Sequence, residues 1–284
     1  MRVDTMRALF LSLALILCAP LAHAQTSDPC GATDHACEID GGEYFIALPD
    51  RDVPKGAVVF LHGWGGQGAG IMNNASLRDN VLNRGYAFVA PNGTPRSNGN
   101  GRSWSFHPDL PIARDDIGFL ADVMADLPSR HGVPAEHILL GGFSAGGFMT
   151  SYLACATPDA ASAYVPVSGG FWRPHPQGCA GPVRLFHTHG WADTVVPLEG
   201  RLLRNGTLAQ GDIFHGMDLW RQANGCTEMA ADRTSTEGTF WLRGWDRCAP
   251  GSALEFALFP GGHSIPRGWT DMVLDWYEAL PSPK

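Results

Sequence analysis

Short, mostly apolar segments alternate along the chain with longer segments in which apolar residues follow helical spacing. Continuous apolar runs such as Ala57–Leu61 are typical of strands that are buried on both faces of a parallel sheet. The predicted strands are Tyr44–Leu48, Ala57–Leu61, Tyr86–Ala90, His137–Gly141, Ala163–Val167, Val183–His187, a strand near Phe240, and Leu254–Phe259. The predicted helices are Ile71–Asn83, Asp115–Arg130, a helix that follows Ser144 and runs through Ala156, Ile213–Ala223, and Arg267–Leu280. This alternation predicts an α/β fold with a mostly parallel central sheet flanked by helices.

The stretch from Asn92 to Ser105 interrupts the pattern, because it is rich in glycine, asparagine and serine and has no periodicity. A loop of this length is usually functional or mobile. No internal repeat, low-complexity tract or linker marks a second domain. We therefore expect residues 25–284 to form a single domain of a size that needs no metal to be stable.

The first 24 residues have the composition of a secretory signal peptide. A basic start is followed by the apolar run Ala8–Pro20 and by the small-x-small site Ala22-His23-Ala24. The run is shorter than the roughly 20 apolar residues that a membrane-spanning helix needs. We expect a secreted product, extracellular or periplasmic, that begins near Gln25; lipid attachment at Cys18 is the alternative, but Leu17 stands where a small residue would be expected.

Charge and cysteine content agree with an exported protein. The chain has 20 Lys+Arg against 28 Asp+Glu, and removal of residues 1–24 would take the formal charge from −8 to −9. An acidic balance argues against nucleic acid or an anionic membrane as a partner. Cys18 leaves with the signal, so six cysteines remain, and disulfides are their natural role outside the cytosol. Among the 15 possible pairings we predict the one that joins sequence neighbours: Cys30 with Cys37, Cys155 with Cys179, and Cys226 with Cys248.

The segment Gly142-x-Ser144-x-Gly146 matches a nucleophile elbow, in which a tight turn between a strand and a helix exposes a strained serine. The five-residue pattern is weak alone, since a glycine-rich turn would also match it. Here a predicted strand precedes the motif and a predicted helix follows it, as the elbow requires. Ser144 is therefore the candidate nucleophile.

Two loops offer hydrogen-bond donors for a developing oxyanion. Ala145 N–H lies at the start of the predicted helix, where the positive end of the helix dipole also acts. The second donor should come from the loop after an earlier strand, and Trp64 N–H in His62-Gly63-Trp64-Gly65-Gly66 has that place. His62 itself is interpreted as a buried residue that shapes this loop.

A serine that attacks at neutral pH needs a histidine base and a carboxylate that orients it. Asp193 follows the strand Val183–His187, and His263 follows the strand Leu254–Phe259. Sites in α/β sheets form outside the carboxyl ends of the strands, so Ser144, Asp193 and His263 can converge. Asp212 is a rival acid, but its place at a predicted helix start is explained by capping.

His187 and His189 alternate along a strand end and could resemble a metal pair. No third ligand lies nearby in the sequence, and no Cys-x-x-Cys or His/Cys cluster has zinc spacing. Packing or pocket lining is the better interpretation. We expect neither a metal nor an organic cofactor.

The motifs together resemble one known group, the α/β-hydrolase esterases that include extracellular polyhydroxybutyrate depolymerases and feruloyl or acetylxylan esterases. The resemblance rests on an ordered set that spans most of the predicted mature chain: Leu61-His62-Gly63, Asp115-Asp116-Ile117-Gly118-Phe119, Gly142–Gly147, His189-Gly190-x-x-Asp193-x-x-Val196-Pro197 and Gly261-Gly262-His263. It implies an α/β-hydrolase fold, a triad of Ser144, Asp193 and His263, and an oxyanion hole formed by Trp64 and Ala145. Trp64 and Ile265-Pro266 depart from the group's pattern, which leaves the acyl group open.

The predicted activity is that of a serine carboxylic ester hydrolase that works through an acyl-enzyme. Aromatic residues on the predicted loops would suit a feruloyl group or an apolar polyester chain equally well. They are Trp64, Trp104, Phe106, Phe171, Trp172 and Trp191. A serine peptidase or an acyltransferase could use the same triad, and a catalytically inactive polymer-binding module is the alternative from another class.

Overall fold

Ten strands form one mixed sheet in the computed structural model, which describes residues 1, 30–31, 35–107 and 109–282. The strand order is β1-β2-β4-β3-β7-β8-β9-β14-β13-β12. The six central strands, from β4 to β14, run parallel, and the pairs at the two ends of the sheet are antiparallel. The predicted mostly parallel sheet is confirmed.

The strands of this sheet are β1 (Cys37–Ile39), β2 (Gly42–Ala47), β3 (Ala57–Leu61), β4 (Ala87–Pro91), β7 (Ile138–Phe143), β8 (Ala163–Val167), β9 (Arg184–Gly190), β12 (Arg233–Glu237), β13 (Phe240–Trp245) and β14 (Ala253–Phe259). Two small hairpins are formed by β5 (Thr94–Pro95) with β6 (Arg102–Ser103) and by β10 (Leu202–Leu203) with β11 (Leu208–Ala209). The helices are α1 (Gly68–Met72), α2 (Ala75–Asn83), α3 (Asp116–His131), α4 (Ala145–Ala156), α5 (Ile213–Ala223) and α6 (Trp269–Ala279), with short 3-10 turns at Ala135–His137 and Arg204–Gly206.

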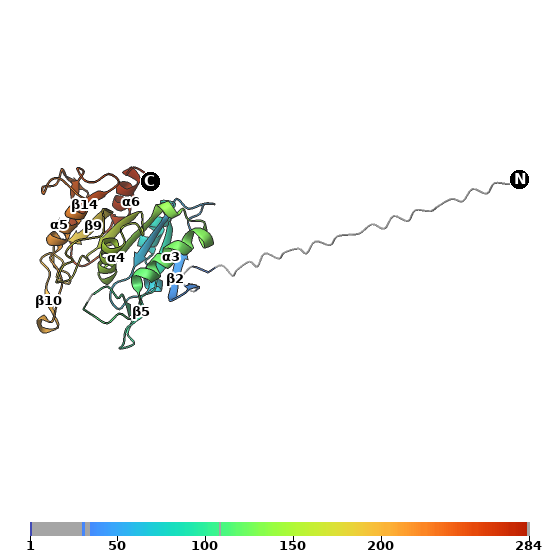
Figure 1. Cartoon of the computed structure of the whole chain (residues 1–284), viewed down its shortest axis with the longest axis horizontal. Coiled ribbons are helices and arrows are strands. Elements are labelled where there is room, and N and C mark those ends of the chain that lie inside the picture. Colours follow the sequence, from blue (N-terminus) through green and yellow to red (C-terminus); the bar gives the residue numbers. More distant parts are fainter. Residues whose placement is uncertain (2–29, 32–34, 108, 283–284) are drawn as a thin grey trace.

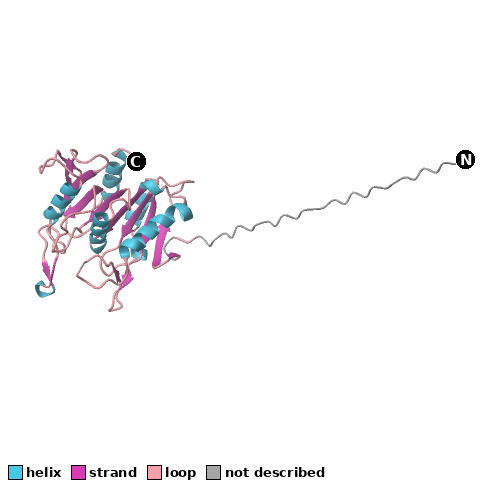
Figure 2. Ribbon diagram, in the orientation of Figure 1, coloured by secondary structure: helices cyan, strands magenta, loops and turns pink. Residues whose placement is uncertain are grey.

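Helices cover both faces of the sheet, as Figures 1 and 2 show. Successive side chains of a strand point to opposite faces, so in β3 Val59 joins one hydrophobic cluster, while Val58 and Phe60 join the other. The first cluster takes the apolar faces of α3, α4 and α5, and the second takes those of α1, α2 and α6. Among the described residues, no helix is long and apolar enough to cross a membrane.

The observed elements differ from the sequence prediction in several places, among them the unpredicted short strands β1, β10 and β11. The helix predicted for Ile71–Asn83 is two helices, because the first ends at its C-cap Asn73 and Asn74 caps the second by accepting a hydrogen bond from Leu77 N. The loop predicted for Asn92–Ser105 contains the β5–β6 hairpin. Strand β12 was not predicted, since all five of its side chains are exposed and give no hydrophobic alternation.

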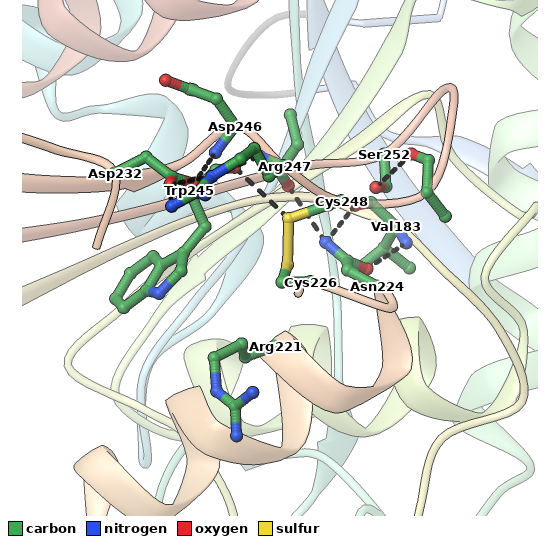
Figure 3. Close-up of a disulfide and its surroundings, with 12 residues drawn as sticks. Val183, Arg221, Asn224, Cys226, Asp232, Trp245, Asp246, Arg247, Cys248 and Ser252 are labelled. Carbon is green, nitrogen blue, oxygen red and sulfur yellow. Dashed lines mark hydrogen bonds and ion pairs between the residues drawn. A yellow bond between two sulfur atoms is a disulfide. The ribbon is translucent and has the colours of Figure 1, made fainter. Parts of the chain in front are cut away.

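Three disulfides join the cysteines in the predicted pairs, Cys30–Cys37, Cys155–Cys179 and Cys226–Cys248. The last of them ties the end of α5 to the segment between β13 and β14 (Figure 3). Beside it, the buried side chain of Asn224 accepts a hydrogen bond from Val183 N and donates one to Val183 O, at the start of β9. The predicted signal peptide lies outside the described residues, apart from Met1.

Candidate active site

The carboxyl ends of the parallel strands meet at one edge of the sheet. Leu61 of β3 is paired with Gly142 of β7, Phe143 of β7 with Val167 of β8, and Gly190 of β9 with Phe259 of β14. The segments that follow these residues therefore emerge side by side. They carry all five residues predicted for the site.

Ser144 occupies the turn between β7 and α4. Its backbone has φ 57° and ψ −115°, a strained combination for a residue with a side chain. A Cβ at Gly142 would lie 2.6 Å from the backbone of Gly146, and one at Gly146 would collide with the carbonyl oxygen of Leu61. Both glycines are therefore required by the tight strand–turn–helix geometry, as the sequence predicts for an elbow.

The two predicted oxyanion donors flank the serine. Ala145 is the first residue of α4, so its N–H has no acceptor within the helix. The Trp64 loop is close on the other side, since a Cβ at Gly63 would lie 3.5 Å from Ser144 Cβ. The Trp64 side chain is 58% exposed, and the Arg96 guanidinium lies 4.3 Å from its ring centroid.

His62 holds the oxyanion loop in place and is buried beneath it. Its Nδ1–H donates to Gly63 O at 2.8 Å, and its Nε2 accepts from Gly93 N at 3.1 Å. Trp104 Nε1 donates to the His62 carbonyl. Burial lowers the pKa of His62 to about 4, so the ring is neutral and both nitrogens are used. The structure supports the loop-shaping role.

Asp193 and His263 are in direct contact. Asp193 Oδ2 lies 2.7 Å from His263 Nδ1, while its Oδ1 accepts hydrogen bonds from the backbone N–H groups of Val195 and Val196. Burial acts to raise the pKa of Asp193, but the hydrogen bonds from His263 and Val196 outweigh it and hold this pKa below its ordinary value. Asp193 is thus held as a carboxylate in contact with the His263 imidazole.

His263 lies next to the elbow, because its ring centroid is 4.6 Å from that of Phe143, the residue before the serine. In the described chain, Ser144 Oγ makes no hydrogen bond with His263. Contacts between nucleophile and base are often long before substrate binds. The rival acid Asp212 caps α5 by accepting from His215 N, as predicted.

An aromatic cluster adjoins Ser144 along α4. Phe148, whose N–H donates to the Ser144 carbonyl, stacks on Phe106 with ring centroids 5.5 Å apart, and Trp172 packs against both rings. Tyr152 stacks on Phe106 from the next turn of the helix. Of the six aromatic residues predicted to line the site, Phe106 and Trp172 are in this cluster, and Phe171 packs against Tyr152 behind it.

Two hydrogen-bond donors in this cluster have no partner among the described residues: Trp172 Nε1 and His107 Nε2. His107 Nδ1 accepts from Asp109 N, so in the neutral ring Nε2 carries the hydrogen. The two rings lie 5.1 Å apart. Buried donors without partners are rare and are often explained by function. His107 was missed in the sequence, where a lone histidine in an irregular loop gives no signal.

Ser168 was also missed. It is fully buried at the end of β8, has φ 51°, and its hydroxyl has no partner among the described residues. The preceding residue, Val167, accepts a hydrogen bond from Ser144 N. A serine after an apolar strand is too common in sequences to be recognised as part of a site.

Comparisons with known proteins place the chain in a family of esterases. The sequence model of the phospholipase/carboxylesterase family matches residues 43–210. The chain is 28% identical over 220 residues to feruloyl esterase C of Emericella nidulans, covering 72% of this chain and 75% of that one. It is 25% identical over 275 residues to a probable feruloyl esterase C of Aspergillus niger, covering 90% and 91% of the two chains.

Solved structures share the fold. Acetyl xylan esterase from Aspergillus awamori superposes with a TM-score of 0.63 at 17% identity, over 84% of this chain and 94% of that one. A carboxylesterase from Mesorhizobium loti superposes with a TM-score of 0.58 at 15% identity, over 86% and 99% of the two chains.

Proposed function

Because this chain belongs to the phospholipase/carboxylesterase family and is a carboxylic ester hydrolase, we propose that it cleaves its ester through Ser144, His263 and Asp193. The observation that carries the proposal is the 2.7 Å contact between Asp193 and His263 beside the strained turn of Ser144. The contact unites two loops that are 70 residues apart in the sequence and places them next to the elbow.

In the proposed mechanism, Ser144 Oγ attacks the ester carbonyl while His263 Nε2 accepts the hydroxyl proton. The N–H groups of Ala145 and Trp64 stabilise the oxyanion of the tetrahedral intermediate. This intermediate expels the alcohol, which takes the proton from His263, and leaves an acyl-enzyme. Water then attacks the acyl carbon and gives its proton to His263. The second intermediate collapses to the carboxylic acid as Ser144 Oγ leaves and takes that proton back from His263. Asp193 keeps the hydrogen of His263 on Nδ1 throughout.

The proposed acyl group is aromatic, as in feruloyl esters of the plant cell wall. Support comes from the relatives named feruloyl esterase and from the cluster of Phe106, Phe148, Tyr152 and Trp172 beside the nucleophile. An aryl ring can stack in such a cluster. The unpartnered donors of Trp172 and His107 would bind an oxygen on that ring.

The same proposal includes export, with residues 1–24 as a signal peptide and residues 25–284 as the mature catalytic domain. The three disulfides support it, because such bonds persist in oxidising compartments.

One experiment tests the nucleophile and the substrate together. The mature protein and its Ser144→Ala variant are assayed on p-nitrophenyl acetate, methyl ferulate and a suspension of polyhydroxybutyrate. We expect the wild type to prefer methyl ferulate over the polyester and the variant to lose turnover of every ester. Unchanged turnover in the variant would exclude Ser144 as the nucleophile; a preference for the polyester would exclude the aryl acyl group only. Added acceptor alcohols and an amide analogue separate hydrolysis from acyl transfer and from peptidase activity.

A further inference from the structure

Two histidines near the end of β9, His187 and His189, are buried in the interior with 2% and 0% of their surfaces exposed. They lie on the same side of the strand, and their rings are parallel within 3°, with centroids 5.4 Å apart. The mechanism above uses neither of them. Buried polar groups of this kind are retained at a cost unless their hydrogen bonds are satisfied.

The hydrogen bonds of the pair define which nitrogen carries each hydrogen. His189 Nε2 lies 2.8 Å from Val196 O, and since a carbonyl oxygen can only accept, Nε2 is the donor. Nδ1 of the neutral ring is then a bare acceptor, and it lies 3.1 Å from His187 Nε2, which must donate. Burial lowers the pKa of both rings, which keeps them neutral. The chain of donors runs from His187 through His189 to Val196.

This series of hydrogen bonds ends at the Asp193 carboxylate. Val196, whose carbonyl accepts from His189, donates its own N–H to Asp193 Oδ1 at 2.8 Å. The Nε2–H of His189 also lies 3.7 Å from Asp193 Oδ2, the oxygen that receives His263. His189 therefore contacts the Asp193–Val196 loop at two points, the backbone carbonyl of Val196 and the carboxylate of Asp193.

We infer that His189, whose ring is oriented by the hydrogen bond from His187, is a positioning residue that fixes the Asp193 carboxylate in line with His263. The inference rests on the proposed role of Asp193. Both ring nitrogens of His189 are engaged by protein groups. Without His189, the Asp193–Val196 loop would lose the side-chain hydrogen bond to the carbonyl oxygen of Val196, the residue whose N–H holds Asp193 Oδ1.

The test compares His189→Gln with His189→Met, two side chains of similar length of which only glutamine can donate to Val196 O. We expect kcat on p-nitrophenyl acetate to fall about 10-fold in the methionine variant, as for the loss of one hydrogen bond to a catalytic group, with KM unchanged. The glutamine variant should stay within about 3-fold of the wild type. Equal kcat in the two variants would overturn the inference.

His187 gives a second, independent comparison, which also serves if His189→Met does not fold. His187→Met should lower kcat, while His187→Gln, which keeps a donor, should not. The double variant His187→Met/His189→Met should be no slower than His189→Met alone, because His187 acts only through His189. Additive losses of kcat in the double variant would show that His187 does not act through His189 alone.

Asp193→Asn separates the inference from the proposed function. If that variant keeps full activity, the proposed triad is wrong. If it is inactive while His189→Met is fully active, the triad stands and the role of His189 is wrong.

Discussion

Asp193 Oδ2 lies 2.7 Å from Nδ1 of His263, and the other oxygen of the same carboxylate is held by two backbone N–H groups. The side chain can therefore present only Oδ2 to the imidazole. With Nδ1 engaged in this way, Nε2 is the nitrogen that is free to exchange a proton with Ser144. The contact links the acid loop after β9 to the base loop after β14.

Replacement of Asp193 by asparagine tests this contact. An amide in place of Oδ2 favours the wrong tautomer of His263, and we expect kcat on p-nitrophenyl acetate to fall by about 10³- to 10⁴-fold with little change in KM. The matched control is Asp212→Asn, since Asp212 only caps α5 and asparagine caps helices equally well. Comparable losses of kcat in the two variants would mean that Asp193 has no catalytic role that the helix cap Asp212 lacks.

The unpartnered donor of Trp172 predicts a preference for acyl rings that carry oxygen. In Trp172→Phe the ring is kept and Nε1–H is lost, so kcat/KM should fall about 5- to 10-fold for methyl ferulate and stay nearly constant for methyl cinnamate. Trp276→Phe, on α6, is the control and should change neither value. A parallel loss for both substrates would show that Trp172 only packs against the acyl chain.

The buried neutral ring of His62 predicts acid sensitivity of the fold. Its pKa is about 4 when folded, below the ordinary histidine value of about 6.5 that applies in the unfolded chain, so between these values the unfolded chain binds a proton that the folded chain does not. Stability is then lost as the pH falls below about 6.5, by about 2 kcal/mol at pH 5 from this group, and the loss levels off below about pH 4.

Urea unfolding of the wild type and of His62→Gln at pH 7.5 and pH 5 measures this contribution. Glutamine does not titrate, so the variant should lose less free energy of unfolding between the two pH values than the wild type does. Equal losses would mean that His62 does not take part in the acid sensitivity.

Much of the fold follows directly from local patterns. Strand Ala57–Leu61 was predicted with its observed bounds because every residue is apolar, and helix Ile213–Ala223 because Asp212 marks its start. The hydrophobic pattern did not predict β12, because all its side chains are exposed and the strand has no alternation of apolar and polar residues. Asn74 carried a capping signal that could have divided the helix predicted for Ile71–Asn83.

The candidate site was predictable as far as its chemistry depends on residue type and chain order. Ser144, Asp193 and His263 each follow a strand whose carboxyl end faces the same edge of the sheet. The support of His189 and the free donor of His107 could not be predicted, because both depend on tautomers that only three-dimensional neighbours define.

The central claim is that Ser144 is the nucleophile, and covalent labelling tests it most directly. The mature protein is treated with an aryl fluorophosphonate, ester turnover is followed, and the modified peptide is identified by mass spectrometry. The account predicts one phosphonyl group per chain, attached to Ser144, with turnover lost in proportion to labelling and no labelling of Ser144→Ala. Complete inhibition with the adduct on another residue, or an active and labelled Ser144→Ala variant, would contradict it.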